Sequence, residues 1–141
     1  MAVVVDSSIF IAAERARFDW VGFHTQLGTE PLYLSVVTFA ELLHGAERAD
    51  TLERRTKRRE FVADVEARYP LLPFGRDEAA EYAKVWAELA ASGNLIGAHD
   101  QMIAATARHY GYRLATLNRS DFARVPGLAV IDAEAFRVAS R

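Results

Sequence analysis

The N-terminal run Ala2-Val3-Val4-Val5-Asp6-Ser7-Ser8 gives the clearest indication of the fold class. It holds a short β-branched segment without polar alternation, which is typical of a strand buried on both faces of a parallel sheet. Four further short apolar segments have the same character, and helical patterns separate them. Strands that alternate with helices predict an α/β fold with a mainly parallel central sheet of about five short strands flanked by helices.

The expected elements follow one another without a linker, an internal repeat or a low-complexity segment. Strands are expected at residues 2–5, 32–35, 71–74, 114–116 and 128–131. Helices are expected at residues 8–15, 20–27, 36–48, 51–69, 76–91 and 98–110, with a terminal helical turn from residue 133. The length of 141 residues predicts a single domain over residues 1–141.

The composition excludes several classes of function. The chain has no cysteine, which excludes disulfides, thiolate zinc sites, iron–sulfur clusters and cysteine nucleophiles. Its formal net charge is -2, so contact with nucleic acid must depend on a local basic patch. No segment approaches the roughly 18 consecutive apolar residues of a membrane helix, and the N-terminus lacks the basic start of a secretory signal. We therefore expect a cytoplasmic protein.

Four carboxylates stand where a parallel sheet places its ligand site, outside the carboxyl ends of the strands. Asp6 ends the first predicted strand, and Asp121 follows the fourth. Glu41 and Asp100 lie near the starts of two predicted helices, and Asp100 continues the apolar face of its helix. Taken singly, each has a structural alternative: a helix cap for Asp6 or Asp100, a capping box of Thr38 with Glu41, and a turn or cap for Asp121.

Taken together, the four acids predict a metal site. Negative charges that share one pocket must raise their pKa values or bind cations. Hard oxygen ligands select magnesium or manganese. These ions activate water and stabilise the leaving oxygen in phosphodiester hydrolysis, so the residue types indicate a metal-dependent phosphodiesterase.

The same residues carry a resemblance to PIN-domain ribonucleases, specifically to the VapC-type toxins of toxin–antitoxin pairs. The matching segments extend over almost the whole chain and are Val5-Asp6-Ser7-Ser8, Ser35-x-x-Thr38-x-Ala40-Glu41-Leu42-x-x-Gly45, Asp100-x-x-Ile103-Ala104-Ala105-Thr106-Ala107 and Ala115-Thr116-x-Asn118-x-x-Asp121-Phe122. In one respect the chain departs from the pattern, because Ser8 stands where many relatives have Asn. Any side-chain hydrogen bond from this position must therefore come from a hydroxyl.

The resemblance implies a site and a mode of action. The implied ligands of Mg²⁺ or Mn²⁺ are Asp6, Glu41, Asp100 and Asp121, and the implied auxiliary residues are Ser7, Thr116 and Asn118. The implied protein is a homodimeric toxin that hydrolyses RNA and is inhibited by a VapB-type antitoxin. We expect the antitoxin to insert an Arg or Lys into the acidic pocket and to cover apolar surface near Trp20 and Phe23 with an amphipathic helix.

A basic cluster supplies the candidate RNA-binding surface. The candidate RNA-binding residues are Arg54, Arg55, Arg58, Arg59 and Arg119. Arg15 and Arg17 are further candidates. The alternative for the four arginines at positions 54–59 is a solvated helix face with ion pairs such as Glu53 with Lys57.

Two other functions stay open at this level. Asp6 stands where a phosphatase of the haloacid-dehalogenase type carries its nucleophile, although Ser8 occupies the position of the second Asp that such enzymes need. A non-catalytic PIN-like module that only binds a protein partner is the other, but such a module has no need of all four acids.

Overall fold

Five short strands form one sheet with the order β3-β2-β1-β4-β5, and every neighbouring pair is parallel. The structure, a computed structural model, describes residues 1–139. The strands are β1 (Val3–Val5), β2 (Leu32–Ser35), β3 (Leu71–Leu72), β4 (Arg113–Thr116) and β5 (Val130–Asp132). This arrangement confirms the predicted α/β class and the parallel sheet.

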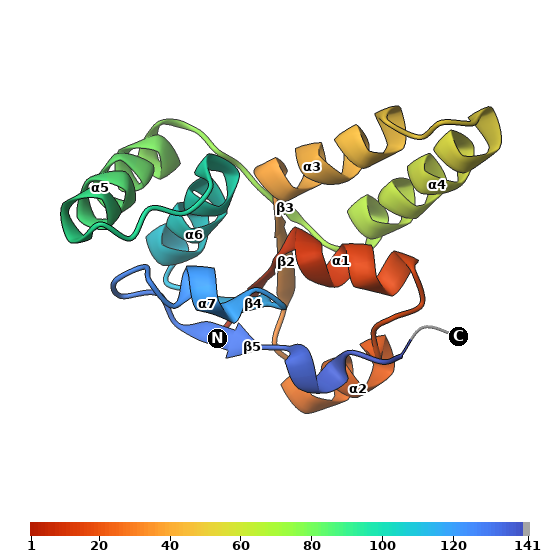
Figure 1. Cartoon of the computed structure of the whole chain (residues 1–141). Coiled ribbons are helices and arrows are strands. Elements are labelled where there is room, and N and C mark those ends of the chain that lie inside the picture. The colour runs from red at the N-terminus through yellow and green to blue at the C-terminus, as the bar shows by residue number, and fades with distance from the viewer. Residues whose placement is uncertain (140–141) are drawn as a thin grey trace.

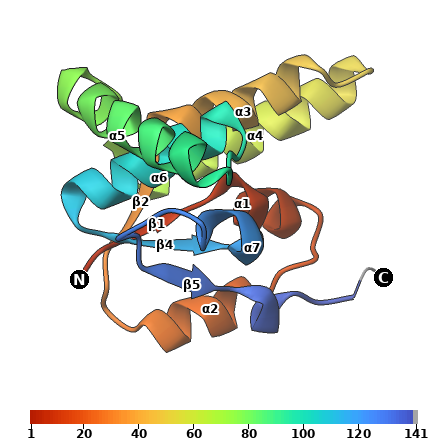
Figure 2. The same ribbon diagram turned by 60° about the vertical axis from the view of Figure 1, so that its left-hand side comes forward.

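Helices connect the strands and cover both faces of the sheet (Figure 1, Figure 2). They are α1 (Ser7–Glu14), α2 (Trp20–Leu27), α3 (Val36–Glu47), α4 (Leu52–Arg68), α5 (Arg76–Ser92), α6 (Ala98–Tyr110) and α7 (Arg119–Phe122), followed by the 3-10 turn η1 (Glu134–Phe136). The predicted helix boundaries agree to within one residue. The edge strand β3 ends two residues early, before Pro73, which has no N–H for a ladder hydrogen bond. Helix α7 was not predicted.

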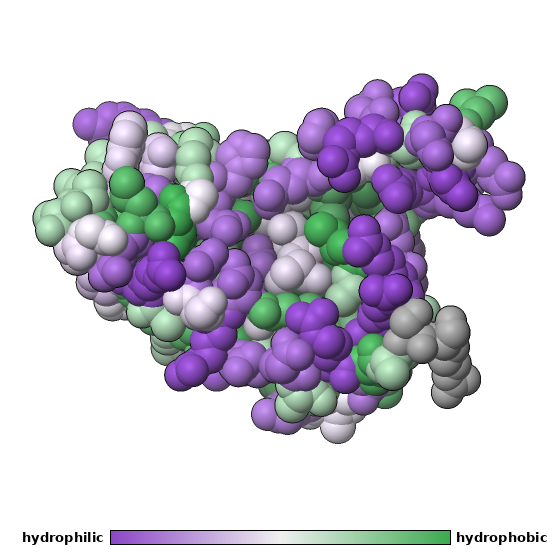
Figure 3. All heavy atoms as spheres, viewed as in Figure 1, coloured by the Kyte–Doolittle hydropathy of each residue, from purple (hydrophilic) through white to green (hydrophobic). Residues whose placement is uncertain are grey.

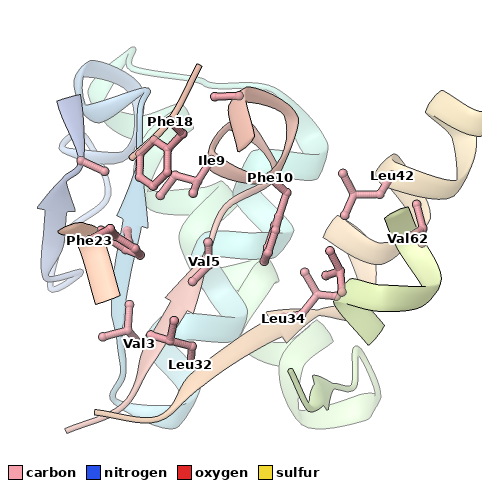
Figure 4. Close-up of a cluster of buried hydrophobic side chains, with 14 residues drawn as sticks. Val3, Val5, Ile9, Phe10, Phe18, Phe23, Leu32, Leu34, Leu42 and Val62 are labelled. Carbon is pink, nitrogen blue, oxygen red and sulfur yellow. The ribbon is translucent and has the colours of Figure 1, made fainter. Parts of the chain in front are cut away.

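The valine run of β1 is explained by a core on each side of the sheet. Val3 and Val5 belong to the cluster that packs under α1 and α2, whereas Val4 belongs to the cluster under α5 and α6. Successive side chains of a strand point to opposite faces, so a strand covered on both sides has no polar position. Figure 4 shows Phe10 of α1 pointing toward Leu34 of β2 and toward the residues of α3 and α4.

Helices α3 and α4 form a hairpin that extends away from the sheet (Figure 1). Its outer surface is largely hydrophilic (Figure 3), and it carries the basic cluster of residues 54–59. Over residues 1–139, none of the helices has the length and apolar character needed to span a membrane.

Candidate active site

Asp6 lies at the carboxyl end of β1, and hydroxyl groups hold its carboxylate. Thr116 at the end of β4 donates to Asp6 Oδ2 at 2.8 Å, and Ser8 donates to the same oxygen at 2.7 Å. Asp6 is the N-cap residue of α1, but its side chain makes no capping hydrogen bond. The helix-cap alternative therefore does not explain this carboxylate, which is 3% exposed. Its surroundings instead fix its orientation at the edge of the sheet.

Ser8 holds Asp6 in place, although it was not among the predicted auxiliary residues. Its Oγ also accepts a hydrogen bond from the Leu117 backbone N–H at 3.0 Å, so Ser8 ties the start of α1 to the segment after β4. Ser7, predicted as an auxiliary residue, donates a longer hydrogen bond of 3.5 Å to Asp6 Oδ1. Its hydroxyl also opposes the rise in the pKa of Glu41 that burial causes. The Ser8 hydroxyl thus supports Asp6 directly.

Glu41 stands more than one turn inside α3. The helix begins after Ser35, whose side chain accepts a hydrogen bond from the Val37 N–H at 3.1 Å. Thr38 is therefore a buried residue inside the helix, and the capping box of Thr38 with Glu41 is wrong. Within residues 1–139, Glu41 Oε1 is buried and has no hydrogen-bond partner. A buried carboxylate oxygen without a partner is costly, so this atom is available for a cation.

Asp100 lies in the first turn of α6, where it faces the other acids. The N-cap residue of α6 is Gly97, so the helix-cap alternative for Asp100 is wrong. Burial, followed by the negative charges of Asp6, Glu41 and Asp121, raises the pKa of Asp100 to about 6, against an opposing effect of His99. Burial also raises the pKa of Glu41, and Asp6 adds to that rise. The structure therefore brings all four predicted acids into one electrostatic environment.

Asp121 is held by its neighbour Asn118. Asn118 is the N-cap residue of α7, and its Nδ2 donates to Asp121 Oδ2 at 2.9 Å. The backbone N–H of Asn118 donates to Thr116 Oγ1 at 2.9 Å. Asp121 thus lies inside a one-turn helix rather than in a loop or at a cap. The predicted auxiliary residues Thr116 and Asn118 connect Asp6 to Asp121 through a chain of hydrogen bonds.

The donor set fits a hydrated Mg²⁺ or Mn²⁺ ion. In the described part of the chain, no three His, Asp or Glu side chains converge as a ready-made metal cage. Magnesium usually keeps several waters and takes one or two carboxylates together with substrate phosphate oxygens, so it does not need such a cage. The unpartnered Glu41 Oε1 and the raised pKa of Asp100 both show a shortage of positive charge. A pocket between α3 and α6 gives access to both side chains.

The predicted basic cluster lies on α4, and its arginines differ in whether a carboxylate pairs with them. Arg54 pairs with Asp50 at 2.8 Å, and Arg59 pairs with Glu47 at 2.6 Å. These exposed pairs match the alternative of a solvated, ion-paired helix face. Arg58 differs, because its guanidinium is partly buried beside α3. The remaining candidates are Arg55, which is partly buried on α4, and Arg119, which is exposed at the start of α7.

Comparisons with known proteins identify relatives of this chain by sequence and by fold. The PIN domain family matches residues 3–128. Ribonuclease VapC1 of Rickettsia felis is 37% identical over 134 residues, which cover 93% of this chain and 96% of the relative. The tRNA(fMet)-specific endonuclease VapC of Salmonella typhimurium is 33% identical over 129 residues, with 92% and 96% covered. The crystal structure of DNA-bound VapBC from Salmonella typhimurium superposes with a TM-score of 0.82 at 27% identity, covering 93% of this chain and 97% of that one. The chain therefore belongs to the PIN-domain family and, within it, to the VapC ribonucleases.

Proposed function

We propose that this protein is a Mg²⁺- or Mn²⁺-dependent endoribonuclease and the toxin of a type II toxin–antitoxin pair. The observation that carries the proposal is the electrostatic environment of Asp100, whose pKa is raised to about 6 by burial and by the other three acids. Such a concentration of negative charge is stable only with protons or cations. The relatives named as ribonucleases support RNA as the substrate.

Each side chain has a separate role in this proposal. Asp6, Glu41, Asp100 and Asp121 would hold the metal, which supplies an activated water and stabilises the leaving oxygen. Ser8 and Thr116 keep the Asp6 carboxylate in one orientation. Asn118 positions Asp121. No side chain acts as a nucleophile, and we expect products with a 5′-phosphate and a 3′-hydroxyl.

The two alternative functions have less support. A haloacid-dehalogenase-type phosphatase needs a free Asp6 nucleophile, but Asp6 Oδ2 accepts hydrogen bonds from both Ser8 and Thr116. A non-catalytic module gains nothing from the unpartnered Glu41 Oε1. Trapping of a phosphoryl-enzyme would favour the first alternative, and an intact interaction with a partner without any RNA cleavage would favour the second.

For the partner, we propose a VapB-type antitoxin, since solved relatives include VapBC complexes. The structure corrects part of the expected docking surface. Phe23 is 1% exposed and belongs to the core, so it is not available to a partner. Trp20 instead lines an apolar groove together with Phe61 and Tyr69, between α1, α2 and α4. An amphipathic helix in this groove, with a basic side chain directed to the acids, would inhibit cleavage.

Several further predictions complete the proposal. The RNA contacts are assigned to Arg54, Arg55, Arg58, Arg59 and Arg119. Arg58 and Arg119 are better candidates for phosphate contacts than Arg54 and Arg59, because carboxylates already pair with Arg54 and Arg59. One PIN domain extends over residues 1–141, of which the last two lie outside the described part. The homodimer and the cytoplasmic location stay predictions.

Sequencing of RNA 5′-ends after controlled expression tests the proposed activity. We expect new 5′-phosphorylated ends at defined positions in cells that express the wild-type chain, because a positioned metal-activated water cleaves internal phosphodiesters. Purified protein should reproduce these cuts with Mn²⁺ and lose them with a chelator. Unchanged 5′-ends in cells, together with no metal-dependent cleavage by the purified protein, would contradict the proposal.

A further inference from the structure

Three arginines from three different helices line one pocket beside the acidic site. Arg15 is the C-cap residue of α1, Arg48 is the C-cap residue of α3, and Arg58 lies on α4. All three line a pocket whose wall also contains Glu41, one of the four acids. Figure 1 shows the α3–α4 hairpin projecting above α1, and Figure 3 shows hydrophilic side chains on both sides of the notch below the hairpin.

The charges of these arginines are largely available to a ligand. Within residues 1–139, the side chains of Arg15 and Arg48 are exposed and form no ion pair or hydrogen bond. Arg58 Nη1 donates to the Gly45 backbone oxygen at 2.8 Å, which fixes its guanidinium without neutralising it. The other acidic residue of the pocket besides Glu41 is Glu14. Arg54, Arg59 and Arg68 of α4 differ, because each of them forms an ion pair with a carboxylate.

A polyanionic substrate needs such a pocket at this place. The four acids repel an RNA backbone, so binding energy must come from cationic groups close to the acids. A guanidinium binds phosphate oxygens through two parallel hydrogen bonds, and Arg is therefore well suited to hold a phosphate in register. Because the pocket shares Glu41 with the acidic site, a phosphate held there belongs to a nucleotide close to the cleaved bond.

We propose that Arg15, Arg48 and Arg58 form a phosphate subsite that holds the RNA backbone beside the scissile phosphodiester. This inference rests on the proposed ribonuclease function. The sequence had offered Arg15 and Arg58 as separate candidates for RNA contacts; the structure adds Arg48 and brings the three together in one pocket. The subsite places the substrate and leaves the chemistry to the acids, so its loss should affect KM much more than kcat.

The double variant Arg15→Gln/Arg48→Gln tests the subsite without disturbing a contact of the fold. The substrate is a short single-stranded RNA that spans a cleavage site mapped with the wild-type protein. We expect KM to rise about tenfold and kcat to change by less than about twofold. The slope of the logarithm of the binding constant against the logarithm of the salt concentration should fall in magnitude by about 1.4, or about 0.7 for each lost phosphate contact. The control Arg76→Gln/Lys84→Gln removes the same charge from exposed positions on α5 and should leave KM unchanged. Arg58→Lys should raise KM less than Arg58→Gln, because it keeps the charge and loses the fork geometry.

Single methylphosphonates in the RNA locate the contact. Removing the charge of one phosphate near the cleavage site should weaken binding to the wild-type protein and have no further effect on the double variant. If the wild type cleaves RNA but the double variant has the KM and salt dependence of the control, the subsite is wrong and the proposed function stands. If the wild type does not cleave RNA, the proposed function fails as well.

Discussion

Replacing Asp100 by Asn is expected to abolish RNA cleavage and, in metal-free buffer, to raise the melting temperature. Cleavage should fall by about a thousandfold or more, because the change removes a metal ligand and keeps the shape of the side chain. The melting temperature should rise because burial and three neighbouring carboxylates oppose the charge of Asp100.

The stability effect has a defined dependence on pH. The pKa of Asp100 is about 6 in the folded protein and 3.8 as its ordinary value, so the folded state binds the proton more tightly. The wild-type protein should therefore gain stability as the pH falls from 7.5 through 6 toward 4, and the Asn variant should lack this gain. Allowing for the partial exposure of the side chain, the difference at pH 7.5 is about 1–2 kcal/mol, or about 3–8 °C.

Thermal unfolding in the presence of a chelator, at pH 7.5 and at pH 4.5, measures this effect. Glu66→Gln is a suitable control, because Glu66 is exposed on α4 away from the acids. The control should keep full activity and shift the melting temperature by less than about 1 °C. Cleavage by Asp100→Asn at a rate comparable to wild type would refute the catalytic role of Asp100. Equal melting temperatures of the wild type and Asp100→Asn at pH 7.5 would refute the claim that the other acids oppose the charge of Asp100.

The second large effect is expected from the hydroxyls that hold Asp6. The double variant Ser8→Ala/Thr116→Val removes both hydrogen bonds to Asp6 Oδ2. Loss of partners that orient a metal ligand typically costs 10–100-fold in metal affinity or activity, so we expect cleavage at limiting Mn²⁺ to fall by about that factor. Excess Mn²⁺ should restore much of the rate, because the ligand is still present but less well oriented.

A matched control separates this effect from a general loss of hydroxyls. Ser92 and Thr106 donate to the backbone oxygens of Leu89 and Met102, so Ser92→Ala/Thr106→Val removes the same groups without touching an acid. The control should keep the Mn²⁺ dependence of the wild type. If both double variants show the same Mn²⁺ dependence, Ser8 and Thr116 do not position Asp6.

The sequence predicted the sheet and the acids because both depend on local patterns. The valine run of residues 3–5 requires a strand buried on both faces, and the carboxyl ends of parallel strands meet at one edge. Helix α7 has only one turn, so it is too short to show a periodic pattern in the sequence and was not predicted. The capping box was wrong because Ser35 caps α3 three residues before Thr38, and only the end of β2 decides between the two hydroxyls.

The contacts that complete the site depend on the order of the strands. Ser8 reaches Thr116 and Leu117 only because β1 and β4 are neighbours in the sheet. The sequence alone does not show that β1 and β4 are adjacent in the sheet. The same holds for the pocket of Arg15, Arg48 and Arg58, because the sequence alone does not show that these three arginines from separate segments lie together. Local pattern therefore identified the four acids, and tertiary structure was needed to find the hydroxyls that hold Asp6 and the pocket that brings the three arginines together.

The most direct test of the central claim is a calorimetric titration of Mn²⁺ into the metal-free wild-type protein and into Asp100→Asn. The account predicts saturable binding to the wild type and an affinity at least about tenfold lower for the variant, because the four acids supply the ligands. The absence of Mn²⁺ binding to the wild type, or equal affinities of the two proteins, would contradict the claim that these acids form a metal site.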